Sequence, residues 1–217
     1  MIGSACFILG PFPGYLSWVG FRADAMTFFV GSIFFTSAAL LQLIECGIAP
    51  RALARHTRHR AQTLLTIESR RIDWWACAVQ FVGTLFFNVT TFNAFHTDLT
   101  ASEAKNMIWT PDWRGSICFL IASELAYIEA GHSLWSWHPR DRAWRIAALN
   151  FVGSVAFLVS AIASYVLPTT GAPLSLFWTN FGTFVGAVCF FLGAYLLLPE
   201  RTHPDEQREV TGAVAST

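Results

Sequence analysis

Long runs of apolar residues, separated by short polar segments, dominate the hydrophobic pattern of the chain. A helix needs about 20 mostly apolar residues to cross the roughly 30 Å hydrocarbon core of a bilayer, where only helices satisfy their own backbone. We therefore predict an all-α, polytopic membrane bundle of five transmembrane helices, at residues 26–44, 74–95, 115–134, 144–167 and 176–198. Residues 1–25 are expected to lie outside the membrane, and residues 201–217 to form a disordered cytoplasmic tail.

Basic residues fall almost entirely on one side of these predicted helices. If the first helix runs from outside to inside, only Arg22, Lys105 and Arg114 of the 14 basic residues face outward. Cytoplasmic loops carry most of the Lys and Arg in membrane proteins, and tryptophans gather at both ends of the spans, as they do here. We therefore expect a multi-pass cell-membrane protein with its N-terminus outside and its C-terminus in the cytoplasm.

Composition points to lipid rather than water around the chain. Hydrophobic residues make up 54% of it and charged residues only 13%, against about 25% charged in soluble domains. Mean hydropathy is +0.46. The net charge of zero argues against nucleic acid as a partner. The five cysteines show no C-x-x-C spacing, so we expect free thiols and no metal site.

One short motif recurs in every predicted helix: a glycine, a small residue, and a phenylalanine four positions after the glycine. The glycines are Gly31, Gly83, Gly115, Gly153 and Gly186. The simplest account is an internal repeat, in which one helical hairpin is used twice (about 74–129 and 144–200) after half a copy. Residues 1–20 are then the remnant of a missing helix; alternatively, Met1 is an internal start.

Glycines of this kind let helices approach closely, which matters because lipid gives helices no hydrophobic reason to associate. Gly182 and Gly186 form a G-x-x-x-G pair on the last helix, and Gly193 follows on the same face. We interpret these faces as packing surfaces, within the bundle or in a homo-oligomer. A gating hinge is the alternative.

A duplicated hairpin with a G-S-x-x-F motif resembles the YrhK-like family of small membrane proteins. The resemblance covers most of residues 26–200 and rests on that short motif. It implies a helical membrane protein, and it carries no catalytic residues to transfer.

Ionisable residues are energetically costly inside a membrane, so each of them is first considered as a functional residue. Glu124 lies nine residues after Gly115, which the predicted span puts near the middle of the bilayer. Its expected partners are Asn88, on a polar stripe with Thr84 and Thr91, and Tyr127 one turn away. Two interpretations stay open: a proton or ion path through the bundle, or a hydrogen bond that joins two helices.

A second polar set is expected at the inner membrane face. Glu45, Glu129 and Glu200 follow their glycines by 14 residues, whereas Arg70 and Arg140 begin the ascending helices on the same side. Negative charge at the C-terminal end of a helix opposes the helix dipole. We therefore predict Glu–Arg ion pairs, with an acidic ion site as the alternative. His132, one turn after Glu129, is a further partner.

The segment RALARHTRHR favours contact with anionic lipid through Arg51, Arg55, Arg58 and Arg60.

No catalytic motif is present, and His96 and His132 differ too much in depth to ligate one haem iron, so we expect neither enzymatic activity nor a cofactor. Three functions are weighed: an accessory or structural membrane component, a small ion channel or proton-coupled transporter using Glu124 and Asn88, and, weakest, an intramembrane enzyme.

Overall fold

The computed structural model describes residues 1–53 and 71–198, and that part of the chain is all-helical. Two short helices, α1 (Ile2–Leu9) and α2 (Tyr15–Val19), precede the long helix α3 (Phe21–Leu53). Next come α4 (Ile72–Asn93), α5 (Ala101–Ala104) and a π-helical turn η1 (Lys105–Trp109), which runs directly into α6 (Thr110–Gly131). The last two helices are α7 (Arg142–Ala163) and α8 (Leu176–Leu197).

Within the described residues, four helices are long and apolar enough to cross a membrane: Phe21–Gly47 of α3, and α4, α7 and α8. A multi-pass membrane protein is therefore indicated. The helix α6 has the same 22 residues as α4, α7 and α8 but is not among the four. Arg114, Glu124 and Glu129 make it more polar than its neighbours. The prediction of five spans thus stays a prediction.

The helix ends differ from the predicted boundaries for local reasons. The helix α3 begins before residue 26 and continues past residue 44 to Leu53. The helix α6 ends at Gly131 rather than at residue 134, because His132 adopts a left-handed backbone conformation (φ 52°) that a helix cannot continue through.

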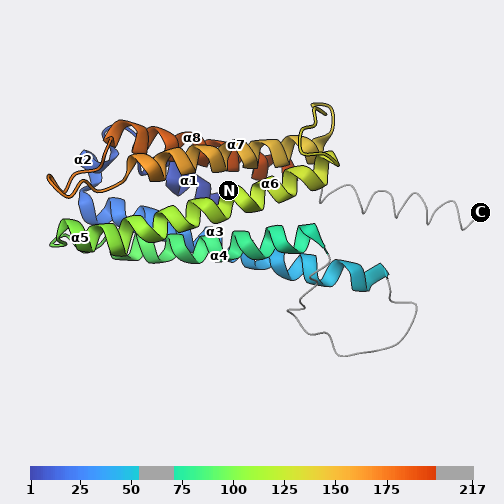
Figure 1. Cartoon of the computed structure of the whole chain (residues 1–217), viewed down its shortest axis with the longest axis horizontal. Coiled ribbons are helices and arrows are strands. Elements are labelled where there is room, and N and C mark those ends of the chain that lie inside the picture. Colours follow the sequence, from blue (N-terminus) through green and yellow to red (C-terminus); the bar gives the residue numbers. More distant parts are fainter. Residues whose placement is uncertain (54–70, 199–217) are drawn as a thin grey trace, which may run out of the picture.

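The long helices lie side by side and alternate in direction (Figure 1). The helices α2 and α5 and the α7–α8 connection lie at one end of the bundle, and the α6–α7 connection lies at the other. The ends carry exposed aromatic side chains, with Trp18 83% exposed at the first end and Trp135 89% exposed at the second.

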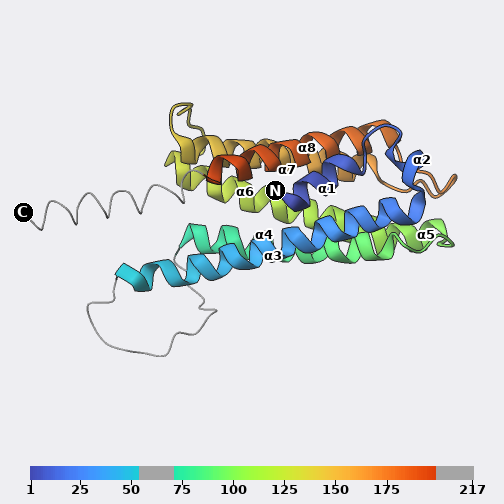
Figure 2. The ribbon, with the colours of Figure 1, turned by 180° about the vertical axis from the view of Figure 1, so that it is seen from behind.

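Six helices form a closed ring in the order α1, α3, α4, α6, α7, α8, because each packs against the next and α8 packs against α1. The short helix α1 lies between α3 and α8 (Figure 2). The N-terminal segment, predicted to lie outside the membrane, therefore contributes a helix to the bundle. Since α1 has only eight residues, it covers only part of the length that a long helix covers at the other positions of the ring.

Phenylalanine rings fill the centre of this ring of helices. Each of the six helices supplies one, namely Phe7, Phe35, Phe87, Phe119, Phe157 and Phe190. Neighbouring ring centroids are 5.1 to 6.5 Å apart, mostly edge-to-face, with Phe157 stacked on Phe190. Edge-to-face and offset-stacked arrangements are the favourable geometries for aromatic pairs. Five of these rings, all except Phe7, are the phenylalanines of the recurring motif, so the motif builds the core.

Candidate functional site

Three helix pairs meet through the same glycine contact. A methyl group added at Gly115 of α6 would lie 3.1 Å from the carbonyl oxygen of Gly83 on α4. A methyl group at Gly186 of α8 would lie 2.9 Å from the carbonyl oxygen of Gly153 on α7. In each pair the two backbones are therefore close enough that only glycine fits without a shift.

The third pair joins α1 to α3. A methyl group at Gly3 would lie 2.8 Å from the carbonyl oxygen of Gly31, and Phe7 follows Gly3 by four residues. Gly3 and Phe7 are thus a further copy of the recurring motif. Sequence reasoning missed this copy because a helix of eight residues is too short to be recognised as a span.

The glycine face of α8 also packs inside the bundle. A methyl group at Gly182 would lie 2.7 Å from the carbonyl oxygen of Ala156, and one at Gly193 would lie 2.8 Å from Oδ1 of Asn150. Both neighbours belong to α7. This face is therefore covered by α7 in the monomer, and a contact with a second copy of the chain has to use another surface.

A polar seam joins α3 to α4. The hydroxyl groups of Ser32 and Thr91 are 2.9 Å apart, and Nδ2 of Asn88 donates to Oγ1 of Thr36 at 2.9 Å. Thr84 is buried in the same seam, where its carbonyl oxygen accepts a hydrogen bond from Thr36 at 3.5 Å. The predicted polar stripe of α4 thus lies between two helices, and it faces α3.

Glu124 does not take part in this seam. It is exposed on α6, and the amide of Asn88 bonds to α3 instead. Its place along the bundle follows from Gly115, which contacts Gly83, 11 residues after Ile72 and at the middle of α4. Nine residues further along α6 is about 13 Å, so Glu124 lies toward the end of the bundle that carries the α6–α7 connection, and its depth in a bilayer stays a prediction.

Tyr127 has a structural partner of its own. Its hydroxyl donates to the carbonyl oxygen of Ser136, whose side chain accepts a 3.1 Å hydrogen bond from Nε1 of Trp144. Tyr127 therefore holds the α6–α7 connection against the start of α7. The structure does not join it to Asn88 or to the polar seam.

The Glu–Arg ion pairs predicted among Glu45, Glu129, Glu200, Arg70 and Arg140 stay a prediction. Among the described residues, Arg71 forms an ion pair with Asp73, two residues apart at the start of α4. Arg71 and His132 also lie near enough to Glu129 to interact with it electrostatically. Arg140 and Glu45 are both exposed. Arg70 and Glu200, the other members of the predicted set, lie outside the described residues, as do the side chains of Arg51, Arg55, Arg58 and Arg60.

A carboxyl group that sequence reasoning did not single out lies near the opposite end of the bundle. Asp112, in the first turn of α6, is half-buried, and Oγ of Ser164 donates to its Oδ2 at 3.4 Å. Trp109 lies about one helical turn before Asp112, and its Nε1 donates to the carbonyl oxygen of Ala161 at 2.8 Å. The available signal was the position of Asp112, three residues before Gly115, but that position lay outside the span predicted at residues 115–134.

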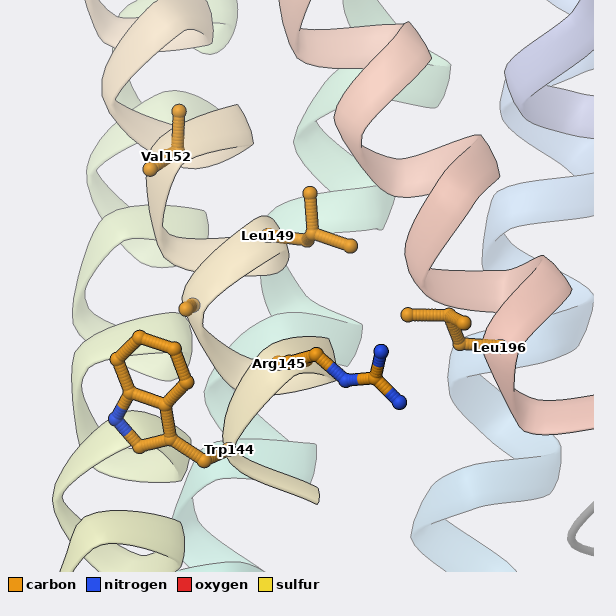
Figure 3. A pocket seen from close by; sticks show the side chains of 6 residues that line it. Trp144, Arg145, Leu149, Val152 and Leu196 are labelled. Carbon is orange, nitrogen blue, oxygen red and sulfur yellow. The ribbon is translucent and has the colours of Figure 1, made fainter. Parts of the chain in front are cut away.

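An apolar groove of about 330 Å³ opens on the outside of the bundle, between α7 and α8. Figure 3 shows Arg145 and Leu149 pointing from α7 toward Leu196 of α8. Trp144 and Val152 line the rest of its length. A cationic group beside an apolar groove suits a lipid better than a polar metabolite.

The described residues bring together no group of three His, Cys, Asp or Glu side chains that could hold a metal ion. Comparison of the chain with protein-family models, curated proteins and solved structures finds no match.

Proposed function

We propose that this protein is a non-enzymatic accessory or structural component of a cell membrane. The observation that carries the proposal is the closed centre of the bundle, where phenylalanine rings from all six ring helices touch one another. A transport path needs a polar or water-filled lining. The polar seam between α3 and α4 is a helix contact, and its hydroxyl groups bond mainly to one another and to the backbone.

The proposal includes five spans. The 22 residues of α6 cover about 33 Å, which matches the hydrocarbon core of a bilayer. This helix also lies in the ring between α4 and α7, both apolar enough to span. A helix enclosed between two spans can carry polar residues toward one end, where Glu124 and Glu129 lie.

The orientation is proposed from charge. The end that carries the α6–α7 connection also holds Arg140, Arg142 and Arg145, and cytoplasmic ends are enriched in Arg and Lys. The end that carries α2 and α5 is then outside, and the C-terminus is cytoplasmic. Exposed tryptophans at both ends of the bundle suit the two membrane–water interfaces.

The proposal also includes an internal repeat and a relationship to the YrhK-like family. Support for the repeat comes from the three helix pairs α1–α3, α4–α6 and α7–α8, each of which meets through a glycine and a backbone carbonyl. The family relationship still rests on the G-S-x-x-F motif alone.

An accessory component acts through partners. Because the glycine face of α8 is covered by α7, a second copy or another membrane protein would bind on the outside of the ring, where Glu124 of α6 is exposed. Anionic lipid is the other proposed partner. Arg51, Arg55, Arg58 and Arg60 would contact its head groups, and Arg145 would do so beside the groove between α7 and α8.

Partner binding is tested by the size of the native particle. Two differently tagged copies are expressed together and extracted in mild detergent. We expect a particle larger than the monomer; co-purification of the two tags identifies a homo-oligomer, and its absence identifies a different partner. A particle that is always monomeric contradicts the accessory role.

The alternative function is a small ion channel or proton-coupled transporter. One observation favours it: Oδ1 of Asn88 is buried in the α3–α4 seam and has no hydrogen-bond partner in the part of the chain that the structure describes. An acceptor of this kind can bind water or a cation.

Flux through proteoliposomes separates the two functions. We expect the wild-type protein to pass protons and potassium ions no faster than empty liposomes do, and Glu124→Gln and Asn88→Leu to behave identically. The accessory proposal fails if the wild type shows flux and either substitution abolishes it in a protein that is still folded.

A further inference from the structure

Two cysteines face each other at the inner ends of α3 and α4. The Sγ atoms of Cys46 and Cys77 are 2.8 Å apart, although the residues are separated by 31 positions. Both side chains are half-buried. Because α3 and α4 pack against each other along the seam described above, the two thiols are held in contact by the fold.

The other three cysteines are in a different situation. Cys6, Cys118 and Cys189 each lie three residues after a motif glycine and pack against the glycine of the neighbouring helix. Among the described residues, none of these three has a thiol beside it. Their positions suit them for packing, and they serve as internal controls for the first pair.

Polar groups surround the Cys46–Cys77 pair. Arg71 donates to the carbonyl oxygen of Cys46 at 3.2 Å and forms an ion pair with Asp73. Glu129 of α6 is also close enough to act on both thiols electrostatically. Charged side chains at the end of a bundle keep water nearby, so a small water-soluble oxidant can reach these thiols.

We propose that Cys46 and Cys77 are a redox modification site, and that they form a reversible disulfide with a two-electron oxidant such as hydrogen peroxide. One thiol reacts with peroxide to give a sulfenic acid and one molecule of water. The second thiol then attacks that sulfur, which forms the S–S bond and releases a second water. A dithiol reductant supplies two electrons and two protons to restore both thiols.

The bond would join the inner ends of α3 and α4 and close a loop from residue 46 to residue 77. That loop contains Arg51, Arg55, Arg58 and Arg60, the residues proposed to contact anionic lipid. If this end is cytoplasmic, as proposed above, the pair is reduced at rest and the bond forms under oxidative conditions. The chemistry itself depends on neither the orientation nor the proposed function.

Peptide mapping of the full-length protein in lipid nanodiscs tests the proposal. The protein is reduced, freed of reductant, treated with hydrogen peroxide, alkylated, and digested with trypsin. Trypsin releases Cys46 in fragment 23–51 and Cys77 in fragment 72–105. We expect these fragments to appear linked, with the loss of two hydrogen atoms, in the monomer band. A dithiol should separate them.

Substitutions give the controls. Cys46→Ser and Cys77→Ser should each abolish the linked species, whereas Cys118→Ser should leave it unchanged. The proposal is overturned if peroxide leaves both fragments separate in the folded wild type. It is equally overturned if the link appears only in a dimer, or if Cys6, Cys118 or Cys189 pairs in its place.

Discussion

At the scale of single residues, this bundle depends on glycines that face backbone. Lipid tails are as apolar as the side chains they touch, so helices in a membrane gain little from burying apolar surface and depend on close packing. Where a glycine faces a flexible side chain, that side chain can move aside when the glycine is replaced by a larger residue. Gly182 instead faces the carbonyl oxygen of Ala156 and the backbone nitrogen of Ser160, neither of which can rotate away.

We therefore predict that Gly182→Ala destabilises the protein by about 1–3 kcal/mol, the usual range for overpacking. The added methyl group would lie 2.7 Å from the Ala156 oxygen, so α7 and α8 must separate. The measurement is the midpoint of unfolding in a mixed detergent titration. Leu192→Ala, on the exposed side of the same helix, is the control and should leave the midpoint nearly unchanged. Equal effects of the two substitutions would contradict the close α7–α8 contact.

At the scale of helices, the pairs differ in what holds them. The pairs α4–α6 and α7–α8 meet through glycines, whereas α3 and α4 meet through the hydrogen-bonded seam that includes Thr36 and Asn88. Hydrogen bonds between helices in a membrane contribute modestly, about 0.6 kcal/mol on average. The seam therefore fixes the pairing of α3 with α4 more than it stabilises the whole bundle.

A double-mutant cycle tests the seam. Thr36→Val and Asn88→Leu each remove one member of the 2.9 Å hydrogen bond, so their combined effect should be smaller than the sum of the single effects, by about 0.6 kcal/mol. The readout is the unfolding midpoint in detergent. Ser37→Ala combined with Asn88→Leu is the control, because the Ser37 hydroxyl is exposed and donates to the carbonyl oxygen of Ile33 in its own helix. Additive effects of Thr36→Val and Asn88→Leu would mean that the two side chains do not interact.

The long helices could be predicted from the sequence, whereas their partners and their offsets along the bundle could not. The runs of apolar residues indicated α3, α4, α7 and α8, and the spacing of glycine and phenylalanine indicated a packing motif. Glu124 was expected near mid-membrane because Gly115 was taken as the outer end of its span. The position of Glu124 along the bundle depends on which residue of the next helix Gly115 touches, and only the fold supplies Gly83 as that residue.

At the scale of the whole molecule, α1 turns five long helices into a closed ring. It packs against both α3 and α8, and Phe7 joins the central rings. A hydropathy window cannot detect such a helix, because eight residues are far fewer than the about 20 that cross a bilayer. The ring nevertheless gives every long helix two neighbours, and this includes α6, whose own composition does not mark it as a span.

The number of spans and their orientation can be tested together. Asp98 lies before α5 and Arg140 lies after α6, so α6 is the only long helix between them; both side chains are exposed. We predict that a membrane-impermeant maleimide labels Asp98→Cys in intact cells, and labels Arg140→Cys only after permeabilisation. The unsubstituted protein gives the background from its own five cysteines.

The alternatives give different labelling patterns. If the orientation is inverted, Arg140→Cys is the one labelled in intact cells. If both positions are labelled from the same side, α6 does not cross the membrane and the protein has four spans. In that case α4 and α7 would have to separate from α6 to cross the bilayer without it. The ring of helices would then not be intact in the membrane, because α6 packs along both of them. This packing of α6 between α4 and α7 is the reason that we predict labelling of the two positions from opposite sides.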